Sequence, residues 1–417
     1  MPPSSSRADA RPLPSQGQLL LPLLETLSAH GGDASPSVVA DALADRFALT
    51  EEQRTAQVNI QSTGGTTSAW GRHVRWVRER AKTLGFVTST SRALWSLTPA
   101  GKAGLRNASA GVVITIYETA EGEAIYAKCE DALRVLMPSH YSLLVSSPPF
   151  PELRKDYEGQ LDERAWHAWM MDVLGAAYDV LAPNSTLVLN LGPRYLKGVP
   201  HHSLYRERLY LALAEHTRFV PAQEFVFSNP SKLPSPAQWC TVLKVRAKST
   251  LEHCMAFVKG DPKWDTASLK VPYSAAMQAR LAAGGESRTR VKPSGHALKE
   301  GAFSTDNGGS LPSDLLTFSN AVSNDAYQRH CRAHGLPIHP ARFPEGLAEF
   351  FIKLTTKPGD SVLDIFGGRS TVGVVAERLG RRWTTVERSL TYIGGGAGVF
   401  LDRPNFRAHV DLPGVGA

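Results

Sequence analysis

Short apolar runs alternate with amphipathic helical stretches between residues 112 and 259. Apolar runs of four to eight residues predict buried strands, and apolar residues three and four apart predict helices. In chain order we expect strands at 114–117 and 125–128, a helix at 131–137, a strand at 143–146, a helix at 163–181, a strand at 186–191, a helix at 204–216 and a strand at 224–227. This alternation indicates a parallel α/β sheet with helices on both faces.

The same alternation returns near the end of the chain. An amphipathic helix is expected at 344–354, followed by a strand that ends at Asp364, a turn at Gly367 and Gly368, and a helix at 371–379. A further strand at 383–387 ends in Glu387. Strand, glycine turn, helix, strand and acid in this order build a nucleoside pocket, because the glycines allow close backbone approach and the acid binds ribose hydroxyls.

The N-terminal pattern differs. Helices are expected at 18–27, 36–47 and 66–83, followed by a hairpin at 86–97. Three helices and a hairpin make a winged helix, whose third helix usually enters the major groove of DNA. One face of that helix carries Arg72, Arg75, Arg78, Arg80 and Lys82. We expect Arg75 and Arg78 to contact DNA; the alternative is a packing or dimerisation module whose arginines are merely solvated.

Composition adds weak constraints on class and partner. The net charge of +7 and the pI near 9.2 are compatible with a polyanionic partner. The four cysteines show no Cys-x-x-Cys pairing, which indicates a reducing cytoplasm and neither a zinc site nor a disulfide framework. No apolar run is long enough for a membrane span, and residues 1–15, rich in Pro, Ser and Arg, predict a disordered tail rather than a signal peptide.

The stretch from 261 to 330 changes character, because apolar residues become sparse and basic residues occur among Gly, Ser and Asn. One interpretation is a disordered surface insertion. The other, which we favour because of the flanking motifs, is a DNA-reading segment that orders on binding. Its candidate DNA contacts are Arg288, Arg290, Lys292 and His296.

The tetrapeptide Ser147-Pro148-Pro149-Phe150 directly follows the predicted strand at 143–146. Two prolines stop the ladder of hydrogen bonds and hold the chain extended at the strand's end. A hydroxyl oxygen and a proline carbonyl can then hold an amino group between them, while a flat ring stacks on the phenylalanine. Methylation of the exocyclic amine of a nucleobase requires such an arrangement.

The sequence Asp-x-Phe-x-Gly at 364–368 differs from the dinucleotide pattern Gly-x-Gly-x-x-Gly. A carboxylate at this turn suits S-adenosylmethionine, whose amino-acid part carries an ammonium, better than a pyrophosphate. C5-methylation of cytosine requires a cysteine nucleophile, normally after a proline, and none of the four cysteines follows a proline. That reaction is therefore excluded.

In its order of motifs the chain resembles the beta-class amino-methyltransferases of bacterial restriction–modification systems, and more narrowly their N4-cytosine group. The stretches that carry this resemblance are 146–159, 187–192, 229–239, 293–296 with 306–309, and 339–344, besides the Asp-x-Phe-x-Gly turn. Residues 16–106 resemble the N-terminal winged-helix domain of Mrr-type restriction proteins. The resemblance implies a circularly permuted Rossmann-like methyltransferase sheet, with a target-base half at 111–260, a target-recognition segment at 261–330 and an S-adenosylmethionine-binding half at 331–417.

The resemblance also implies roles for single residues. Ser147 and the Pro148 carbonyl would hold the amine of a flipped cytosine, with Phe150, or Phe227 as a second candidate, stacked on its ring; Phe227 could equally be a core residue. The cofactor would contact Asp364, Phe366, Gly367, Gly368, Glu387, either Glu130 or Asp131, and Phe343, with His339 and Arg342 beside it. Further candidate DNA contacts are Arg154, Lys155 and Lys232.

Two departures from the family pattern stand out. Arg369 occupies a position where a small residue is usual, and we expect its side chain to point to solvent or toward a DNA phosphate. The run Gly394–Gly396 is expected to replace the helix that normally follows the ribose-binding strand.

These features leave alternatives to N4-cytosine methylation of double-stranded DNA: N6-adenine methylation, a DNA-binding regulator with an inactive site, and methylation of a protein amide, against which the winged helix argues. No metal is expected. A cognate restriction endonuclease and a second copy of the chain are candidate partners, and the bacterial nucleoid in the cytoplasm is the expected location.

Overall fold

The structure is a computed structural model of the 417-residue chain. It describes residues 13–14, 16–59, 65–91, 93–105, 107–151, 161–319, 324–410, 412 and 415. Within them, no helix is both long and apolar enough to cross a membrane.

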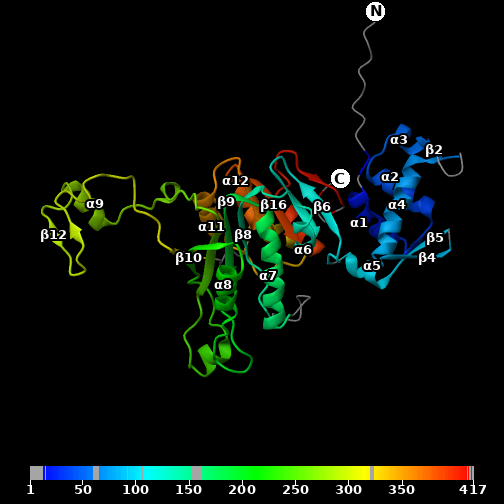
Figure 1. Cartoon of the computed structure of the whole chain (residues 1–417). Helices are drawn as coiled ribbons and strands as arrows, with labels where there is room; N and C mark the ends of the chain where they lie inside the picture. Colours follow the sequence, from blue (N-terminus) through cyan, green and yellow to red (C-terminus); the bar gives the residue numbers. More distant parts are fainter. Residues whose placement is uncertain are drawn as a thin grey trace, which may run out of the picture.

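The N-terminal unit is a winged helix (blue in Figure 1). Its helices are α1 (Gln16–Ala29), α2 (Pro36–Arg46), α3 (Glu51–Thr55), α4 (Ala69–Thr83) and α5 (Pro99–Gly104). Its strands are β1 (Asp33–Ala34), β2 (Gln57–Asn59), β3 (Thr66–Ser68), β4 (Val87–Ser91) and β5 (Leu94–Leu97), with β1, β5 and β4 in one sheet. The helix expected at 66–83 is α4, and it begins at Ala69 rather than Thr66. Residues 66–68 pair with β2 instead, and Ser68 Oγ caps the helix by accepting a hydrogen bond from the Gly71 N–H.

A ten-stranded sheet forms the centre of the second unit, in the order β14-β10-β11-β9-β8-β15-β16-β7-β6-β17. Its strands are β6 (Val113–Glu118), β7 (Gly122–Ala127), β8 (Tyr141–Ser146), β9 (Leu181–Leu191), β10 (Val220–Ser228), β11 (Leu251–Lys259), β14 (Leu315–Thr317), β15 (Ser361–Asp364), β16 (Arg382–Glu387) and β17 (Arg407–Ala408). The five central strands, from β9 to β7, are parallel. The flanking pairs β6–β7 and β10–β11 are antiparallel, so the expected parallel sheet is confirmed only at its centre.

Chain order and spatial order differ in this sheet. Strand β15, among the last in the chain, lies between β8 and β16 at the centre. This permutation sets the end of β15 beside the end of β8. Because the carboxyl ends of parallel strands share one edge, the turns after both strands face the same space.

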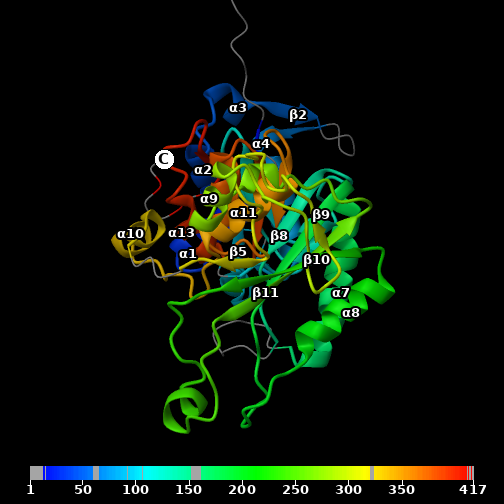
Figure 2. The same ribbon diagram turned by 90° about the vertical axis from the view of Figure 1, so that its left-hand side faces the viewer.

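Helices cover both faces of the sheet. One face carries α6 (Cys129–Leu133), α7 (Glu163–Val180) and α8 (Tyr205–His216), and the other carries α11 (Glu345–Thr355), α12 (Thr371–Arg378) and α13 (Leu390–Ala397), with α10 (Ala326–Ala333) packed on α13. Figure 2 shows α11 and the pair α7 and α8 on opposite sides of the strands. Within β8, Leu144 packs on the α7 side whereas Leu143 and Val145 pack on the α11 side, as the two-residue period of a strand requires.

Of the segment expected at 261–330, β14 belongs to the sheet and Trp264 packs against the core. Residues 266–314 form a lobe that projects from the sheet (yellow in Figure 1). It contains the short helix α9 (Ala275–Ala282) and the hairpin β12 (Arg290–Val291) with β13 (Ala297–Leu298), besides the 3-10 turn Ala267–Leu269. No residue of α9 is buried. The predicted lack of a hydrophobic core is confirmed here.

The linker between the units passes the carboxyl end of β16. Ala108 donates its N–H to Arg388 O at 2.7 Å, and Gly111 donates to Asp131 Oδ2 at 2.8 Å. Tyr126 Oη donates to Gly104 O at 2.7 Å from within the sheet. These bonds fix the winged helix to the second unit beside the turn that follows Glu387.

Candidate active site

The two motifs that lie more than two hundred residues apart in the chain meet at the carboxyl edge of the sheet. Leu143 and Leu144 of β8 pair with Val362 and Leu363 of β15. At the last residue of each strand, Ser146 Oγ of β8 donates a hydrogen bond of 2.5 Å to Asp364 Oδ1 of β15. Both side chains are buried. The Ser-Pro-Pro-Phe turn and the Asp-x-Phe-x-Gly turn are therefore parts of one site.

The Ser-Pro-Pro-Phe turn is held by bonds from two directions. Ser147 Oγ donates to the backbone carbonyl of Asn190 at 3.1 Å, and Trp166 Nε1 of α7 donates to Pro149 O at 2.6 Å. Because the hydroxyl proton of Ser147 is committed to Asn190, the lone pairs of the oxygen remain as acceptors. Ser147 can accordingly accept a hydrogen bond from an amino group.

The ring of Phe150 is half-buried beside this turn. It lies against Gly192, where an added Cβ would meet the ring at 3.1 Å, so any side chain at this position would crowd the ring. Its centroid is 6.2 Å from that of Tyr205, whose hydroxyl donates to Gly192 O at 2.5 Å. These contacts hold the Phe150 ring in place at the strand edge.

Asp364 has the chemistry of a cation-binding group. It is 4% exposed, and burial raises its pKa to about 7 against the hydrogen bonds from Ser146 and from the Phe366 N–H. No basic side chain pairs with it among the residues that the structure describes. A buried carboxylate with only neutral partners gains most from a cation, because a cation offsets the cost of removing the charge from water.

The glycine turn brings Glu387 close to Asp364. Gly368 donates its N–H to Glu387 Oε2 at 2.9 Å, and Ser389 donates to Oε1 at 2.8 Å. Burial raises the pKa of Glu387 above its usual value despite these bonds. Gly368 has φ +51°, and an added Cβ would meet the His339 ring at 3.3 Å. The turn therefore needs glycine both for its conformation and for the space above it.

The structure separates the two acids proposed for the adenine amine. Glu130 Oε1 accepts from Trp169 Nε1 at 2.5 Å. The Trp169 ring lies 5.7 Å from the ring of Phe366, which belongs to the Asp-x-Phe-x-Gly turn. Burial alone would raise the pKa of Glu130, but hydrogen bonds from its backbone and from Trp169 outweigh it, and the pKa falls. Asp131 bonds instead to Gly111 N and Arg134 Nη1, toward the linker.

His339 and Phe343 come from the segment between α10 and α11. The His339 ring stands 4.4 Å from the Tyr392 ring and covers Gly368. Burial lowers the pKa of His339 to about 4, so the imidazole is neutral at pH 7. Phe343 is half-buried against the core on the α11 side. His339 thus lies over the glycine turn, and the predicted closing of the pocket over the cofactor stays a prediction.

The expectation for Arg369 is wrong. Its side chain is only 10% exposed and points neither to solvent nor outward, because Arg369 Nη1 pairs with Asp325 Oδ2 at 2.5 Å. Its Nε donates to Thr371 Oγ1 at 2.9 Å, and the guanidinium lies 5.5 Å from the centre of the Tyr327 ring. Arg369 therefore joins the Asp-x-Phe-x-Gly turn to the start of α10.

The expectation for Gly394–Gly396 is also wrong. The three glycines lie inside α13 and do not replace a helix. A Cβ on Gly395 would meet Cys331 Sγ of α10 at 3.0 Å, and one on Gly396 would meet Arg369 O at 3.2 Å, so these two glycines let α10 and the turn at Arg369 approach α13. Close packing explains these glycines.

Phe227 is not available to a flipped base. It is 2% exposed and packs in the core, with its ring 6.4 Å from that of Phe318. Phe225 and Phe227 face the same side of β10, where both join the buried cluster. The core interpretation was therefore the right one, and Phe150 remains as the candidate for stacking.

The predicted DNA contacts fall into four groups: exposed, covered, paired with an acid, and outside the described residues. Arg288, Arg290, Lys292 and His296 are exposed on the lobe, and Arg75 is exposed on α4. Arg78 is largely covered, since its guanidinium stacks at 5.5 Å on Trp95 and bonds to Ser89 in the wing. Lys232 pairs with Glu252 Oε1 at 3.2 Å beside the catalytic edge. Arg154 and Lys155 lie outside the described residues.

Two side chains of the site, those of Ser146 and Asn190, were not predicted from the sequence. Ser146 joins the two turns. Asn190 is buried, carries the carbonyl that binds Ser147, and donates its side-chain amide to Glu252 Oε2 at 2.8 Å. The strand Leu187–Leu191 followed by glycine was recognised, but a polar residue inside an apolar strand is the signal that marks Asn190.

Comparison with known proteins identifies the family. The family model described as DNA methylase matches residues 141–395, more than half of the chain, and that of the Mrr N-terminal domain matches residues 17–107. Type II methyltransferase M.PvuII of Proteus hauseri is 37% identical over 288 residues, which cover 69% of this chain and 85% of the relative. A second relative, type II methyltransferase M2.DpnII of Streptococcus pneumoniae, is 47% identical over 55 residues, 13% of this chain and 20% of its own.

A solved structure agrees with these relatives. The structure titled PvuII DNA methyltransferase (cytosine-N4-specific) is 32% identical, with a TM-score of 0.55 over 68% of this chain and 88% of that chain. The predicted permuted sheet and the predicted resemblance are thereby confirmed. The chain belongs to the DNA methylase family and carries an N-terminal domain of the Mrr type.

Proposed function

We propose that this protein transfers a methyl group from S-adenosylmethionine to the N4 amine of a flipped cytosine in double-stranded DNA. The observation that carries the proposal is the hydrogen bond between Ser146 and Asp364, which joins the amine-binding turn to the cation-binding turn. The similarity to a solved cytosine-N4-specific methyltransferase supports the choice of cytosine.

The residues of the glycine turn fit the cofactor. Asp364, buried and without a cationic partner among the described residues, would bind the ammonium of the methionine part. Glu387 would bind the ribose hydroxyls, and Gly367 and Gly368 would allow close approach of the backbone. Phe366 would pack beside the bound molecule, and Glu130, rather than Asp131, would accept from the adenine amine. When bound, the sulfonium supplies an activated methyl group.

The Ser-Pro-Pro-Phe turn would aim the nucleophile. The cytosine amine is a weak nucleophile because its lone pair is delocalised into the ring. Acceptors at Ser147 Oγ and at the Pro148 carbonyl would bind its two N–H groups and direct the lone pair toward the methyl carbon. The N4–C bond then forms as the S–C bond breaks, and the resulting ammonium loses one proton to solvent. In-line placement supplies most of the rate enhancement, so no strong base is needed.

DNA would be held by the exposed basic residues around this edge. The lobe residues Arg288, Arg290, Lys292 and His296 are free of the core and able to adapt to base edges. Arg75 on the exposed face of α4 would contact DNA from the winged helix. Both named relatives are type II methyltransferases, which supports a cognate restriction endonuclease as a partner and the bacterial nucleoid as the location.

Incubation with isotope-labelled S-adenosylmethionine and genomic DNA tests the proposal. We expect label in DNA and, after digestion to nucleosides, N4-methylcytosine as the modified product. Label found only in N6-methyladenine would convert the proposal to the adenine alternative. Label absent from DNA, with the cofactor tightly bound, would refute it.

The inactive-site alternative was motivated by Arg369, and the structure removes that motive. The arginine is turned away from Asp364 by its pairing with Asp325. Tight binding of S-adenosylmethionine in calorimetry, lost in Asp364→Asn, would exclude that alternative directly. A homodimer is a further proposal, and sedimentation of the purified protein alone and with DNA tests it.

A further inference from the structure

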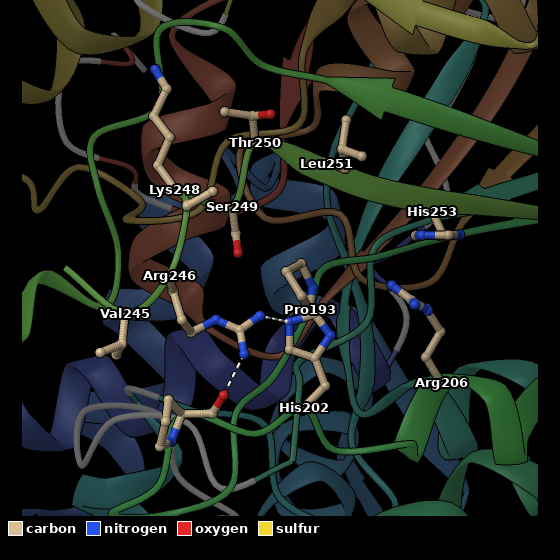
Figure 3. Close-up of a pocket in the computed structure, with 12 residues that line it drawn as sticks. Pro193, His202, Arg206, Val245, Arg246, Lys248, Ser249, Thr250, Leu251 and His253 are labelled. Carbon is tan, nitrogen blue, oxygen red and sulfur yellow. Dashed lines mark hydrogen bonds between the residues drawn. The ribbon is translucent and has the colours of Figure 1, made fainter. Parts of the chain in front are cut away.

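A cavity of about 530 Å³ lies at the same edge of the sheet as Ser147. The loop after β9, the first turn of α8 and the chain from Val245 to His253 form its walls (Figure 3). Cavities of this size admit small ligands or part of a polymer. None of the roles assigned above uses this cavity.

The cavity is joined to the catalytic turn by a short series of contacts. Ser147 bonds to Asn190 O, and Phe150 packs on Gly192, which accepts from the Tyr205 hydroxyl. Pro193, which follows Gly192, and Arg206, which follows Tyr205, line the cavity. A group in the cavity is therefore one layer of side chains from the ring proposed to stack on the target base.

The walls are basic. Of the twelve lining residues, His202, Arg206, Arg246, Lys248 and His253 are basic and none is acidic. Arg206 pairs with Glu207 and His253 with Glu224, both outside the lining. Arg246 and Lys248 have only neutral partners in the described part of the chain. The cavity thus keeps two cations that no acid of the described chain neutralises.

Arg246 is held in place before any ligand arrives. It donates to His202 Nε2 at 2.7 Å and to Pro200 O, and its guanidinium stacks at 4.6 Å on the Tyr195 ring. His202 must be neutral to accept this bond, and burial, with Arg246 and Arg206 nearby, lowers its pKa accordingly. Figure 3 shows Arg246 and Arg206 reaching toward His202 from opposite sides, with Ser249 above them.

We propose that this cavity binds a backbone phosphodiester of DNA next to the extruded cytosine. Arg246, which no acid of the described chain neutralises, is its main cationic contact, and Arg206, which is held by its pairing with Glu207, is the second. The proposal rests on the proposed function, because it presumes that DNA approaches the Ser-Pro-Pro-Phe turn. Two preset guanidinium groups match the charge and geometry of a phosphate. Such contacts position DNA and carry no base information, so the cavity would fix the register of the target strand.

Arg246→Gln tests the cavity, with Arg218→Gln as a matched control. Arg218 is 65% exposed and precedes β10, at the opposite edge of the sheet. DNA affinity would be measured by fluorescence anisotropy between 50 and 200 mM salt, with S-adenosylhomocysteine present. We expect Arg246→Gln to weaken binding about 5- to 10-fold and to reduce the slope of log K against log salt by about 0.9. Arg218→Gln should change neither. Equal affinity and slope in both variants would overturn the proposal.

Uncharged methylphosphonate linkages, placed one at a time beside the target cytosine, test the unaltered protein. We expect one such linkage to weaken DNA binding by the unaltered protein. In Arg246→Gln, which already lacks the contact, the same linkage should cause no further loss of affinity. If the protein methylates DNA and every neutral linkage is tolerated, the cavity proposal fails while the proposed function stands. If it neither binds nor methylates DNA, both fail. Inorganic phosphate bound with an affinity that depends on Arg246, while DNA binding does not, would also overturn the DNA assignment.

Discussion

Polar side chains are buried at the carboxyl edge of the sheet and exposed in the projecting lobe at 266–314. At the edge, Ser146, Asn190 and Asp364 are buried, and each has a hydrogen-bond partner from a distant part of the chain. In the lobe, Arg288, Lys292 and their basic neighbours are exposed. A methyl transfer needs atoms in fixed positions, and burial supplies that order.

Sequence recognition makes a different demand. Base edges and phosphates are contacted by side chains that must adapt as DNA bends and one base leaves the stack. A lobe with few buried side chains costs little to rearrange. Chemistry and recognition are therefore assigned to regions of different rigidity, and substitutions in one region should leave the other intact.

Asp364→Asn should have the largest effect. The amide keeps the acceptor for Ser146 and Phe366 but cannot balance an ammonium, so we expect S-adenosylmethionine to bind at least about 100-fold more weakly. DNA binding should be unchanged. Calorimetry with the cofactor and anisotropy with DNA separate the two, and full cofactor affinity in the variant would disprove the assignment of Asp364.

The same substitution should weaken cofactor binding but stabilise the ligand-free protein. The folded-state pKa of about 7 lies above the value of about 3.9 for an unfolded aspartate. The folded state therefore binds more protons than the unfolded state between these values, and this group makes the ligand-free protein less stable as pH rises from 4 to 7. We expect Asp364→Asn to stabilise the ligand-free protein relative to the unaltered one more at pH 8 than at pH 5, as measured by urea unfolding.

Ser147→Ala should reduce the rate of methyl transfer about 100-fold, because it removes one acceptor for the amine in the transition state. Cofactor affinity should stay the same, since Ser146 and not Ser147 contacts Asp364. Single-turnover rates with saturating DNA measure the effect. Ser142→Ala, within strand β8 that precedes the turn, serves as a control for the loss of a hydroxyl.

Cofactor binding should depend on pH through Asp364. Because the carboxylate must be ionised to bind an ammonium, we expect affinity to fall up to about tenfold for each pH unit below 7. Titrations between pH 5.5 and 7.5 would show this slope. An affinity independent of pH over that range would mean that the carboxyl is already ionised or does not contact the ammonium.

Replacing Arg288, Arg290 and Lys292 by glutamine should weaken DNA binding about 10-fold, because phosphate contacts supply much of the affinity. The unfolding temperature and cofactor affinity should be unchanged, since these side chains are exposed and outside the core. A large loss of stability would show that the lobe is packed more tightly than its exposure indicates.

Arg369→Met should have the smallest effect on the chemistry. It removes the ion pair with Asp325 and leaves that acid partly buried beside Arg342. We expect a loss of about 1–3 kcal/mol in the free energy of unfolding, and less than about threefold change in cofactor affinity. Denaturant unfolding and calorimetry measure both.

The sequence was sufficient where structure is local. The strand before Ser147 and the glycine turn after Asp364 are short patterns of neighbouring residues, and both turns were placed correctly. The order of the motifs also predicted the permuted sheet. Each turn depends on residue types within a dozen positions, whereas the permuted sheet followed from the family resemblance that the order of the distant motifs carries.

The sequence was insufficient where the answer depends on pairing between distant elements. Arg369 was expected to face outward, but its partner Asp325 comes from a helix that packs on α13 only in the folded chain. The sequence left two roles open for Phe227, stacking on the target base or packing in the core, although Phe225, two residues earlier, shares its face of the strand. The period of the strand could have settled that choice, whereas no local pattern shows that Ser146 bonds to Asp364.

A crystal structure of the protein with S-adenosylhomocysteine and DNA containing the target site tests the central claim most directly. We predict an extruded cytosine whose N4 lies within about 3 Å of Ser147 Oγ, with the ammonium of the cofactor product beside Asp364. An extruded base held elsewhere, or an ammonium far from Asp364, would contradict the account.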